Sequence, residues 1–180
     1  MVCKTFRDCF CIDFRGYLPN ITPWGAFLLS FSESRVLAVI LMRLSQFFYQ
    51  KRGLWRLSPL IKRLNEFLTG FECHLGATIG ERLFVAHTQN LVIGEGVIIG
   101  NNVTIYNGVT LGASSRGIGT SVNKRYPIVG DEVIIYTGAK ILGYVHIGAG
   151  ATVGANAVVL KDIPAGCVAV GVPAKIILPH

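Results

Sequence analysis

One histidine, His87, lies where a regular pattern in the sequence changes its spacing. On either side an aliphatic residue recurs every six positions, but the interval between Val85 and Ile93 is eight. An imidazole that titrates near pH ~6.5 can accept the proton of a hydroxyl group as that hydroxyl attacks a carbonyl carbon. His87 is therefore a candidate general base, and the alternative is a polar side chain in an irregular corner of the fold.

The cysteines offer no comparable chemistry. They are five in number and scattered, at Cys3, Cys9, Cys11, Cys73 and Cys167. The spacing of the first three matches no common set of zinc ligands. We interpret all five as reduced thiols of a cytosolic protein and predict no metal site.

The residues that must position His87 belong to a long six-residue repeat. Its aliphatic positions are Ile93, Ile99, Ile105, Leu111, Val129, Ile135, Ile141, Ile147, Val153 and Val159, and a glycine follows six of them. Such a period is typical of a parallel β-helix, whose aliphatic side chains fill the interior while stacked coils bury one another. We predict a mainly β fold of this kind.

The N-terminal part of the chain follows a helical pattern instead. Apolar residues at 36, 37, 40, 41, 44, 47 and 48 predict a helix within Glu33 to Gln50. Ser58-Pro59 begins a second helix, which ends at Gly70, and Thr22-Pro23 is a further helix start. In the second helix the apolar face holds Leu60, Ile61, Leu64, Phe67 and Leu68. We divide the chain into a helical segment, 1–70, and a β-helix domain, 71–180.

A stretch of polar and small residues interrupts the repeat. The interval from Leu111 to Val129 is eighteen residues, and its register positions are Gly117 and Asn123, which are unsuited to an apolar interior. We predict a loop over about residues 113–127 that leaves the β-helix. Loops on a rigid scaffold are common sites of substrate specificity.

Charge and hydropathy restrict where the protein acts. The stretch MVCKTFRDCFCIDF has no continuous apolar region, and polar residues break the apolar segment from Ala26 to Met42. We expect a cytoplasmic protein. Residues 1–70 hold ten Lys/Arg and four Asp/Glu, whereas residues 71–180 hold seven and six. This basic excess suits peripheral contact of residues 22–69 with the inner face of the membrane, or else packing on another subunit. We expect no nucleic-acid partner.

The segments GATIGERLFVAHTQNLVIGEGVIIGNNVTIYNGVTLG and GAKILGYVHIGAGATVGANAVVLKDIPAGCVAVGVPAKII resemble the serine O-acetyltransferase branch of the hexapeptide-repeat acyltransferases. The resemblance covers about Phe71 to Ile177. It implies a left-handed parallel β-helix, a homotrimer, and transfer of acetyl from acetyl-CoA as cosubstrate to a hydroxyl, with no bound cofactor.

The same resemblance implies roles for individual residues. AHTQN occupies the place of the family's Asp-His-Ala-Thr-Gly motif, so His87 matches the catalytic histidine. Glu72 stands where the family has the aspartate that orients it. Such a carboxylate fixes the imidazole tautomer and stabilises the imidazolium that forms.

Departures from the family motif concern the acceptor. Ala86 replaces an aspartate that helps to bind the amino acid, and KRYP keeps Arg125 but has Tyr126 in place of a histidine. The short helical prefix resembles acetyltransferases of capsule and exopolysaccharide pathways. We therefore predict a sugar hydroxyl as acceptor, with Ala86, Arg125 and Tyr126 at the acceptor side, and keep serine as the alternative.

Contacts with CoA are carried over from the family's groove between subunits. Matching positions are Gly112, Ala113, Thr137, Gly138 and Ala139, and Lys161 is placed to meet a CoA phosphate. Two less favoured alternatives remain. One is a zinc enzyme like the hexapeptide-repeat carbonic anhydrases, using His74, His87 and His146, and the other is a non-catalytic trimeric scaffold.

Overall fold

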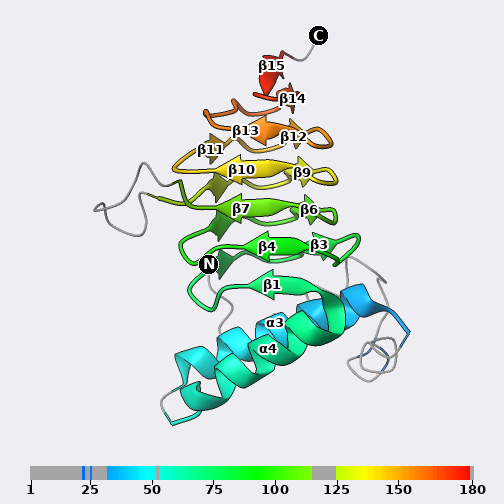
Figure 1. Cartoon of the computed structure of the whole chain (residues 1–180), viewed down its shortest axis with the longest axis vertical. Helices are drawn as coiled ribbons and strands as arrows, with labels where there is room; N and C mark the ends of the chain where they lie inside the picture. Colours follow the sequence, from blue (N-terminus) through cyan, green and yellow to red (C-terminus); the bar gives the residue numbers. More distant parts are fainter. Residues whose placement is uncertain (1–21, 23–24, 26–31, 52, 115–124, 179–180) are drawn as a thin grey trace.

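The computed structural model describes residues 22, 25, 32–51, 53–114 and 125–178, which form a tapering column on a pair of helices (Figure 1). Above the helices, short strands wind into stacked coils, as the six-residue repeat predicts. The predicted loop lies largely outside the described residues, which leave out 115–124.

Three sheets form the walls of the column, and we name them A, B and C. Sheet A holds β1 (Phe71–Cys73), β4 (Leu91–Ile93), β7 (Thr110–Gly112), β10 (Lys140–Leu142) and β13 (Val158–Val159). Sheet B holds β2 (Thr78–Ile79), β5 (Ile98–Ile99), β8 (Ile128–Val129) and β11 (His146–Ile147). Sheet C holds β3 (Phe84–Val85), β6 (Thr104–Ile105), β9 (Ile134–Ile135), β12 (Thr152–Val153), β14 (Val168–Val170) and β15 (Lys175–Ile177).

Neighbouring strands of each sheet pair in parallel, except β14 and β15, which are antiparallel. Parallel strands need a connection that crosses to another place before returning. Here each coil supplies that connection by passing through sheets A, B and C in turn. The column therefore has three edges, which we call the A–B, B–C and C–A edges after the sheets that they join.

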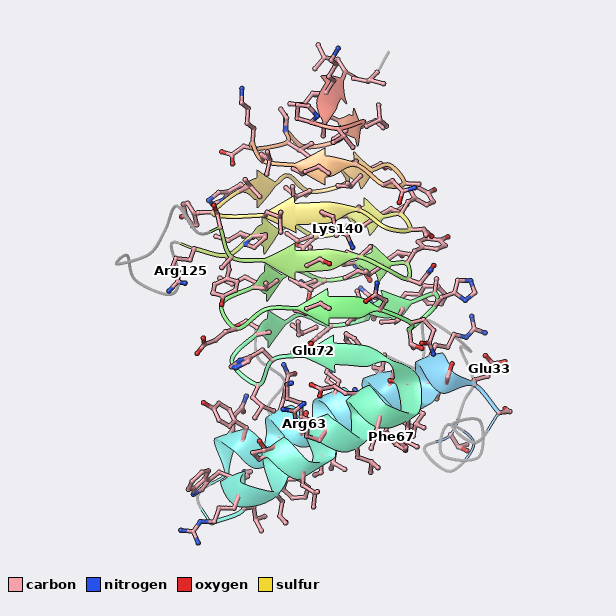
Figure 2. The ribbon with its side chains drawn as sticks, in the orientation of Figure 1. Glu33, Arg63, Phe67, Glu72, Arg125 and Lys140 are labelled. Carbon is pink, nitrogen blue, oxygen red and sulfur yellow. The ribbon has the colours of Figure 1, made fainter. Side chains whose placement is uncertain are left out.

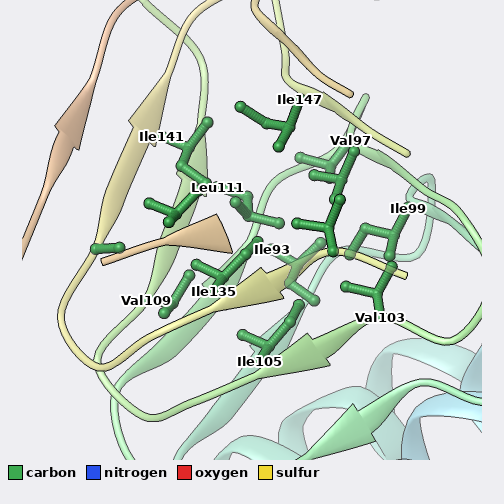
Figure 3. Close-up of a cluster of buried hydrophobic side chains, with 14 of the residues drawn as sticks. Ile93, Val97, Ile99, Val103, Ile105, Val109, Leu111, Ile135, Ile141 and Ile147 are labelled. Carbon is green, nitrogen blue, oxygen red and sulfur yellow. The ribbon is translucent and has the colours of Figure 1, made fainter. Parts of the chain in front are cut away.

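The interior of the column is the apolar core (Figure 3). All ten aliphatic positions of the six-residue repeat are at most 2% exposed. Residues of successive coils stack in register, as Ile93 does under Leu111 and Leu111 under Ile141. The predicted inward face of the repeat is confirmed.

The glycine after an aliphatic position is needed because the coils approach closely at the edges. A Cβ on Gly100 would lie 2.8 Å from the backbone nitrogen of Asp131, and one on Gly148 would lie 2.3 Å from that of Ala165. Crowding by the next coil thus explains why these positions carry no side chain.

Two helices close the wide end of the column. They are α3 (Ser34–Gln50) and α4 (Ser58–Thr69), joined through the short 3₁₀ helix η1 (Trp55–Leu57). Gly70 ends α4 in the left-handed conformation, with φ 71°. For these two helices the predicted boundaries are accurate to within a residue, whereas the predicted helix start at Thr22-Pro23 lies largely outside the described residues. In the described part of the chain no helix is long and apolar enough to span a bilayer.

Hydrogen bonds attach the helices to the first coil. Arg43 of α3 is 7% exposed, and its guanidinium donates to the carbonyl oxygens of Ile79 and Gly80. The side-chain amide of Gln46 donates to the carbonyl oxygen of Ala77. These bonds satisfy carbonyl groups of the end coil, which has no further coil below it.

Candidate active site

His87 lies on the C–A edge between β3 and β4, with its side chain exposed. This turn is two residues longer than the turn from Ile105 to Leu111 one coil above. Thr88 fills the inside of the turn at 3% exposure, and Asn90 takes a positive φ of 56°. The change of spacing in the sequence thus corresponds to an enlarged corner that carries the histidine on its outside.

Two tyrosines follow His87 along the same edge. The ring centroids of His87 and Tyr106 are 6.5 Å apart, and Tyr106 stacks on Tyr136 at 5.1 Å. Neither tyrosine was predicted from the sequence as a site residue. Their positions directly after Ile105 and Ile135 match that of Ala86 after Val85, so the repeat itself placed all three on one edge.

Glu72 lies in the middle of β1 and points outward from sheet A (Figure 2). Its carboxylate is 3.6 Å from the ammonium group of Lys62 in α4. Lys62 also pairs with Glu66, which accepts a second contact from Arg63 at 3.1 Å. Among the described residues no hydrogen bond joins Glu72 to His87. The structure thus places the predicted carboxylate in an ion-pair network with the helix, which sequence reasoning did not anticipate.

Arg125 and Tyr126 lie on the A–B edge, just before β8, and Figure 2 shows Arg125 at the outside of the column. Tyr126 packs over Gly94, where a Cβ would come within 2.5 Å of the tyrosine Cε1. The Nε of Arg125 is buried and has no hydrogen-bond partner among the described residues.

Within one chain, the predicted acceptor residues occupy two different edges. Ala86 and His87 lie on the C–A edge, whereas Arg125 and Tyr126 lie on the A–B edge. Sheet A separates the two edges.

The predicted CoA contacts also fall on both edges. Gly112 and Ala113 lie at the end of β7 on the A–B edge, beside Gly94. Thr137, Gly138 and Ala139 lie above His87 on the C–A edge. The Thr137 hydroxyl donates to Asn107 Oδ1 at 3.1 Å, Gly138 has a φ of 75°, and Ala139 is buried.

Lys161 stands apart from these contacts, near the narrow end of the column. It lines a cavity of about 380 Å³ with Pro173, Ala174 and Ile176. Lys140, by contrast, makes contacts within its own chain. Its ammonium group donates to the carbonyl oxygen of Gly108 and to Thr110 Oγ1.

The remaining histidines make contacts of their own. The Nδ1 of His74 accepts a hydrogen bond from the backbone of Gly76 at 3.1 Å, and the His146 ring packs edge-on against Tyr144 at 5.0 Å. The described residues include no group of three or more His, Cys, Asp or Glu side chains that could hold a metal ion.

Comparison with known proteins shows the family to which this arrangement belongs. Residues 126–161 match the family model described as bacterial transferase hexapeptide (six repeats). The chain is 44% identical over 127 residues to the serine acetyltransferase of Helicobacter pylori, a match that covers 71% of this chain and 72% of that enzyme. The chain belongs to the serine acetyltransferase family.

Other serine acetyltransferases agree in sequence and in fold. The Bacillus pumilus enzyme is 44% identical over 138 residues, which are 77% of this chain but 61% of that enzyme. The chain thus spans about three fifths of that curated relative. The soybean apoenzyme superposes with a TM-score of 0.82 at 32% identity, covering 97% of this chain and 70% of that one. This likeness confirms the predicted left-handed parallel β-helix with a short N-terminal helical segment.

Solved serine acetyltransferases also include complexes with small molecules. The soybean enzyme complexed with serine has a TM-score of 0.82 and 32% identity to this chain. A serine acetyltransferase in complex with CoA has a TM-score of 0.79 and 31% identity.

Proposed function

We propose that this chain is an O-acetyltransferase that moves the acetyl group of acetyl-CoA to the hydroxyl of serine, with His87 as general base. The observation that carries the proposal is the exposed His87 on an enlarged corner of a serine acetyltransferase fold. The hydroxyl oxygen attacks the thioester carbonyl carbon while His87 accepts the hydroxyl proton. The C–S bond then breaks, the acetyl ester forms, and the departing thiolate takes the proton from His87.

Support for serine as the acceptor comes from Arg125. Its buried Nε has no partner in the described part of the chain, and a guanidinium is well suited to bind a carboxylate. Serine offers such a carboxylate close to its hydroxyl. The relatives and complexes named above are serine acetyltransferases as well. These observations favour serine over the sugar that the sequence motifs led us to prefer.

The two edges suggest how the site is completed. His87 and Arg125 lie on opposite sides of sheet A in one chain, so a site that uses both draws them from different copies. We propose a homotrimer with its sites between neighbouring subunits. The acyl donor then lies in a groove flanked by Thr137 and Gly138 of one copy and Gly112 and Ala113 of the next. This arrangement uses the predicted residues of both edges.

Glu72 is proposed as the carboxylate that orients the His87 ring. Its side chain is half exposed, at 53%, and its one ion-pair partner in the described part of the chain is Lys62 at 3.6 Å. A contact of that length in water-accessible surroundings is weak. A rotation of the Glu72 side chain toward His87 on substrate binding therefore costs little free energy.

A sugar hydroxyl remains the second candidate acceptor, because of Ala86. An alanine at this position offers no charge to the ammonium group of an amino acid. Tyr126 adds an aromatic face, on which a sugar ring can stack. This candidate differs from serine in the acceptor and keeps the same base and donor.

The decisive experiment measures CoA release from acetyl-CoA with L-serine and, separately, with a panel of saccharides. We expect turnover with serine, and a loss of about 10²–10⁴-fold in His87→Ala. His146→Ala is the matched control, since His146 is also an exposed histidine of the β-helix but lies against Tyr144. It should retain full activity.

The outcomes separate the parts of the proposal. Turnover with a saccharide alone would replace serine and keep the mechanism. Undiminished turnover in His87→Ala would refute His87 as the base.

A further inference from the structure

Helix α4 packs with its polar side inward. Ser58 and Thr69 are fully buried and Asn65 is 3% exposed. The Asn65 side-chain amide donates to the carbonyl oxygen of Ala38 in α3 at 3.1 Å, and the Thr69 hydroxyl donates to the Asn65 carbonyl oxygen at 2.8 Å. A surface helix ordinarily buries its apolar stripe and leaves its polar face to solvent. In α4 this relationship is reversed.

The apolar stripe of α4 is consequently left outside. Phe67 is 87% exposed and Leu60 is 68% exposed, and Figure 2 shows Phe67 on α4 at the wide end of the molecule. The exposed apolar residues of α4 and of the turn before it are here called the α4 patch, consisting of Leu54, Trp55, Leu57, Leu60, Leu64, Phe67 and Leu68. Exposed apolar surfaces of this kind commonly mark a site of interaction with another molecule.

Basic residues outnumber acidic ones in the helical segment that carries the α4 patch. Residues 34–69 hold seven Lys/Arg against a single acid, Glu66, and so carry a formal charge of +6. Glu66 is already paired with Lys62 and Arg63. Lys51 and Arg56 are exposed at one end, and the guanidinium carbon of Arg56 lies 5.6 Å from the Trp55 ring centroid. A partner that suits this surface therefore has apolar groups and negative charge.

We propose that the α4 patch binds the surface of an anionic lipid bilayer. An exposed face of leucine, phenylalanine and tryptophan bordered by Lys and Arg is the composition of a helix that lies in the plane of the interface. The apolar side chains enter the acyl boundary while the basic groups meet lipid phosphates. A symmetric contact between two copies would instead bring two segments of charge +6 together, which like-charge repulsion opposes.

The binding is independent of acetyl transfer, and so is its test. The full chain is mixed with vesicles of phosphatidylcholine alone, or with part of it replaced by phosphatidylglycerol, and bound protein is measured by flotation. We expect binding to the anionic vesicles that decreases as salt is raised. Leu60→Ser combined with Phe67→Ser should weaken binding at least tenfold, because two large apolar side chains no longer enter the bilayer.

Matched controls distinguish binding through the α4 patch from non-specific binding of the protein to vesicles. Leu178→Ser removes a leucine of the same exposure, 69% against 68% for Leu60, at the opposite end of the chain, and should bind as the wild type does. Lys51→Gln and Arg56→Gln should each lower anionic-vesicle binding about fivefold, whereas Lys175→Gln should not.

Three results would overturn the proposal. One is an absence of binding to the anionic vesicles, and another is equal binding to both vesicle types. The third is self-association in sedimentation that Leu60→Ser with Phe67→Ser abolishes while vesicle binding persists, which would make the patch a contact between copies.

Discussion

The ammonium group of Lys62 in α4 lies 3.6 Å from the carboxylate of Glu72 in β1. This contact links the helix pair to the outer face of sheet A at the coil that carries His87. The helical segment therefore touches the candidate site as well as closing the end of the core.

Glu72→Gln should lower the turnover number at least about tenfold without a change in melting temperature, because a neutral amide cannot stabilise the imidazolium form of His87. Glu72→Asp, which keeps the charge, should restore part of the activity. Lys62→Met is the control that removes the ion-pair partner and leaves the carboxylate. Steady-state kinetics with acetyl-CoA and serine provide the measurement. Full activity in Glu72→Gln would show that His87 needs no carboxylate.

Arg125→Gln should raise the KM for serine by about tenfold or more and change the KM for acetyl-CoA little. The reason is the loss of the charge-assisted bond to the serine carboxylate. Arg125→Lys keeps the charge but not the planar fork, so an intermediate KM is expected. An unchanged serine KM in Arg125→Gln would remove the main support for an amino-acid acceptor.

Arg43→Met should destabilise the protein by about 1–3 kcal/mol, because two partly buried carbonyl groups of the first coil lose their charged donor. Urea denaturation measures the change. Arg63→Met is the comparison, since Arg63 is 81% exposed and its pair with Glu66 lies at the surface. It should change stability by less than about 1 kcal/mol. Equal effects of the two substitutions would mean that Arg43 does not anchor the helices.

Gly148→Ala should cost about 1–3 kcal/mol, because the added Cβ would lie 2.3 Å from the backbone nitrogen of Ala165. Gly112→Ala is the matched variant in the same repeat position, where the nearest atom is the end of the Leu142 side chain at 3.4 Å. It should have little effect on the unfolding midpoint. A stable Gly148→Ala protein would show that neighbouring coils can move apart.

Burial raises the pKa of the Cys73 thiol from 9.0 to about 12, although Arg43 and Lys62 act in the opposite direction. Between these values the unfolded thiol loses its proton and the folded thiol keeps it. The folded state then binds more protons, so the free energy of unfolding falls as pH rises from 9 to 12. Below pH 9 the group contributes no pH dependence.

The measurement for Cys73 compares denaturation midpoints of the wild type and Cys73→Ala at several pH values. Lysines and tyrosines titrate in the same range, so the difference between the two proteins carries the information. The decline should be smaller in Cys73→Ala. Identical slopes would mean that the thiol is accessible to water in the folded state.

The sequence predicted the β-helix in detail because its repeat and its geometry have the same period. Each coil must turn an aliphatic side chain inward at fixed intervals. The position of Ile93 therefore predicts the inward-facing positions of Leu111 and Ile141. The enlarged corner at His87 was visible for the same reason, since an interruption of a strict repeat has an exact position.

The packing of the helical segment could not be predicted from the sequence. Periodicity identified the apolar face of α4 but not the side that packs, and the structure buries Asn65 and exposes Phe67. The buried side of α4 carries Asn65, whose amide donates to the carbonyl oxygen of Ala38 in α3, and such a contact between two helices leaves no period in the sequence.

The candidate site divides in the same way. The change of spacing singled out His87, and the resemblance to the family added Glu72 and Arg125. Only the tertiary structure placed His87 and Arg125 on different edges, paired Glu72 with Lys62 and aligned Tyr106 with Tyr136. The physical reason is that a repeat determines which way each side chain faces within its own coil, whereas contacts between edges, coils and helices depend on how those units stack in space.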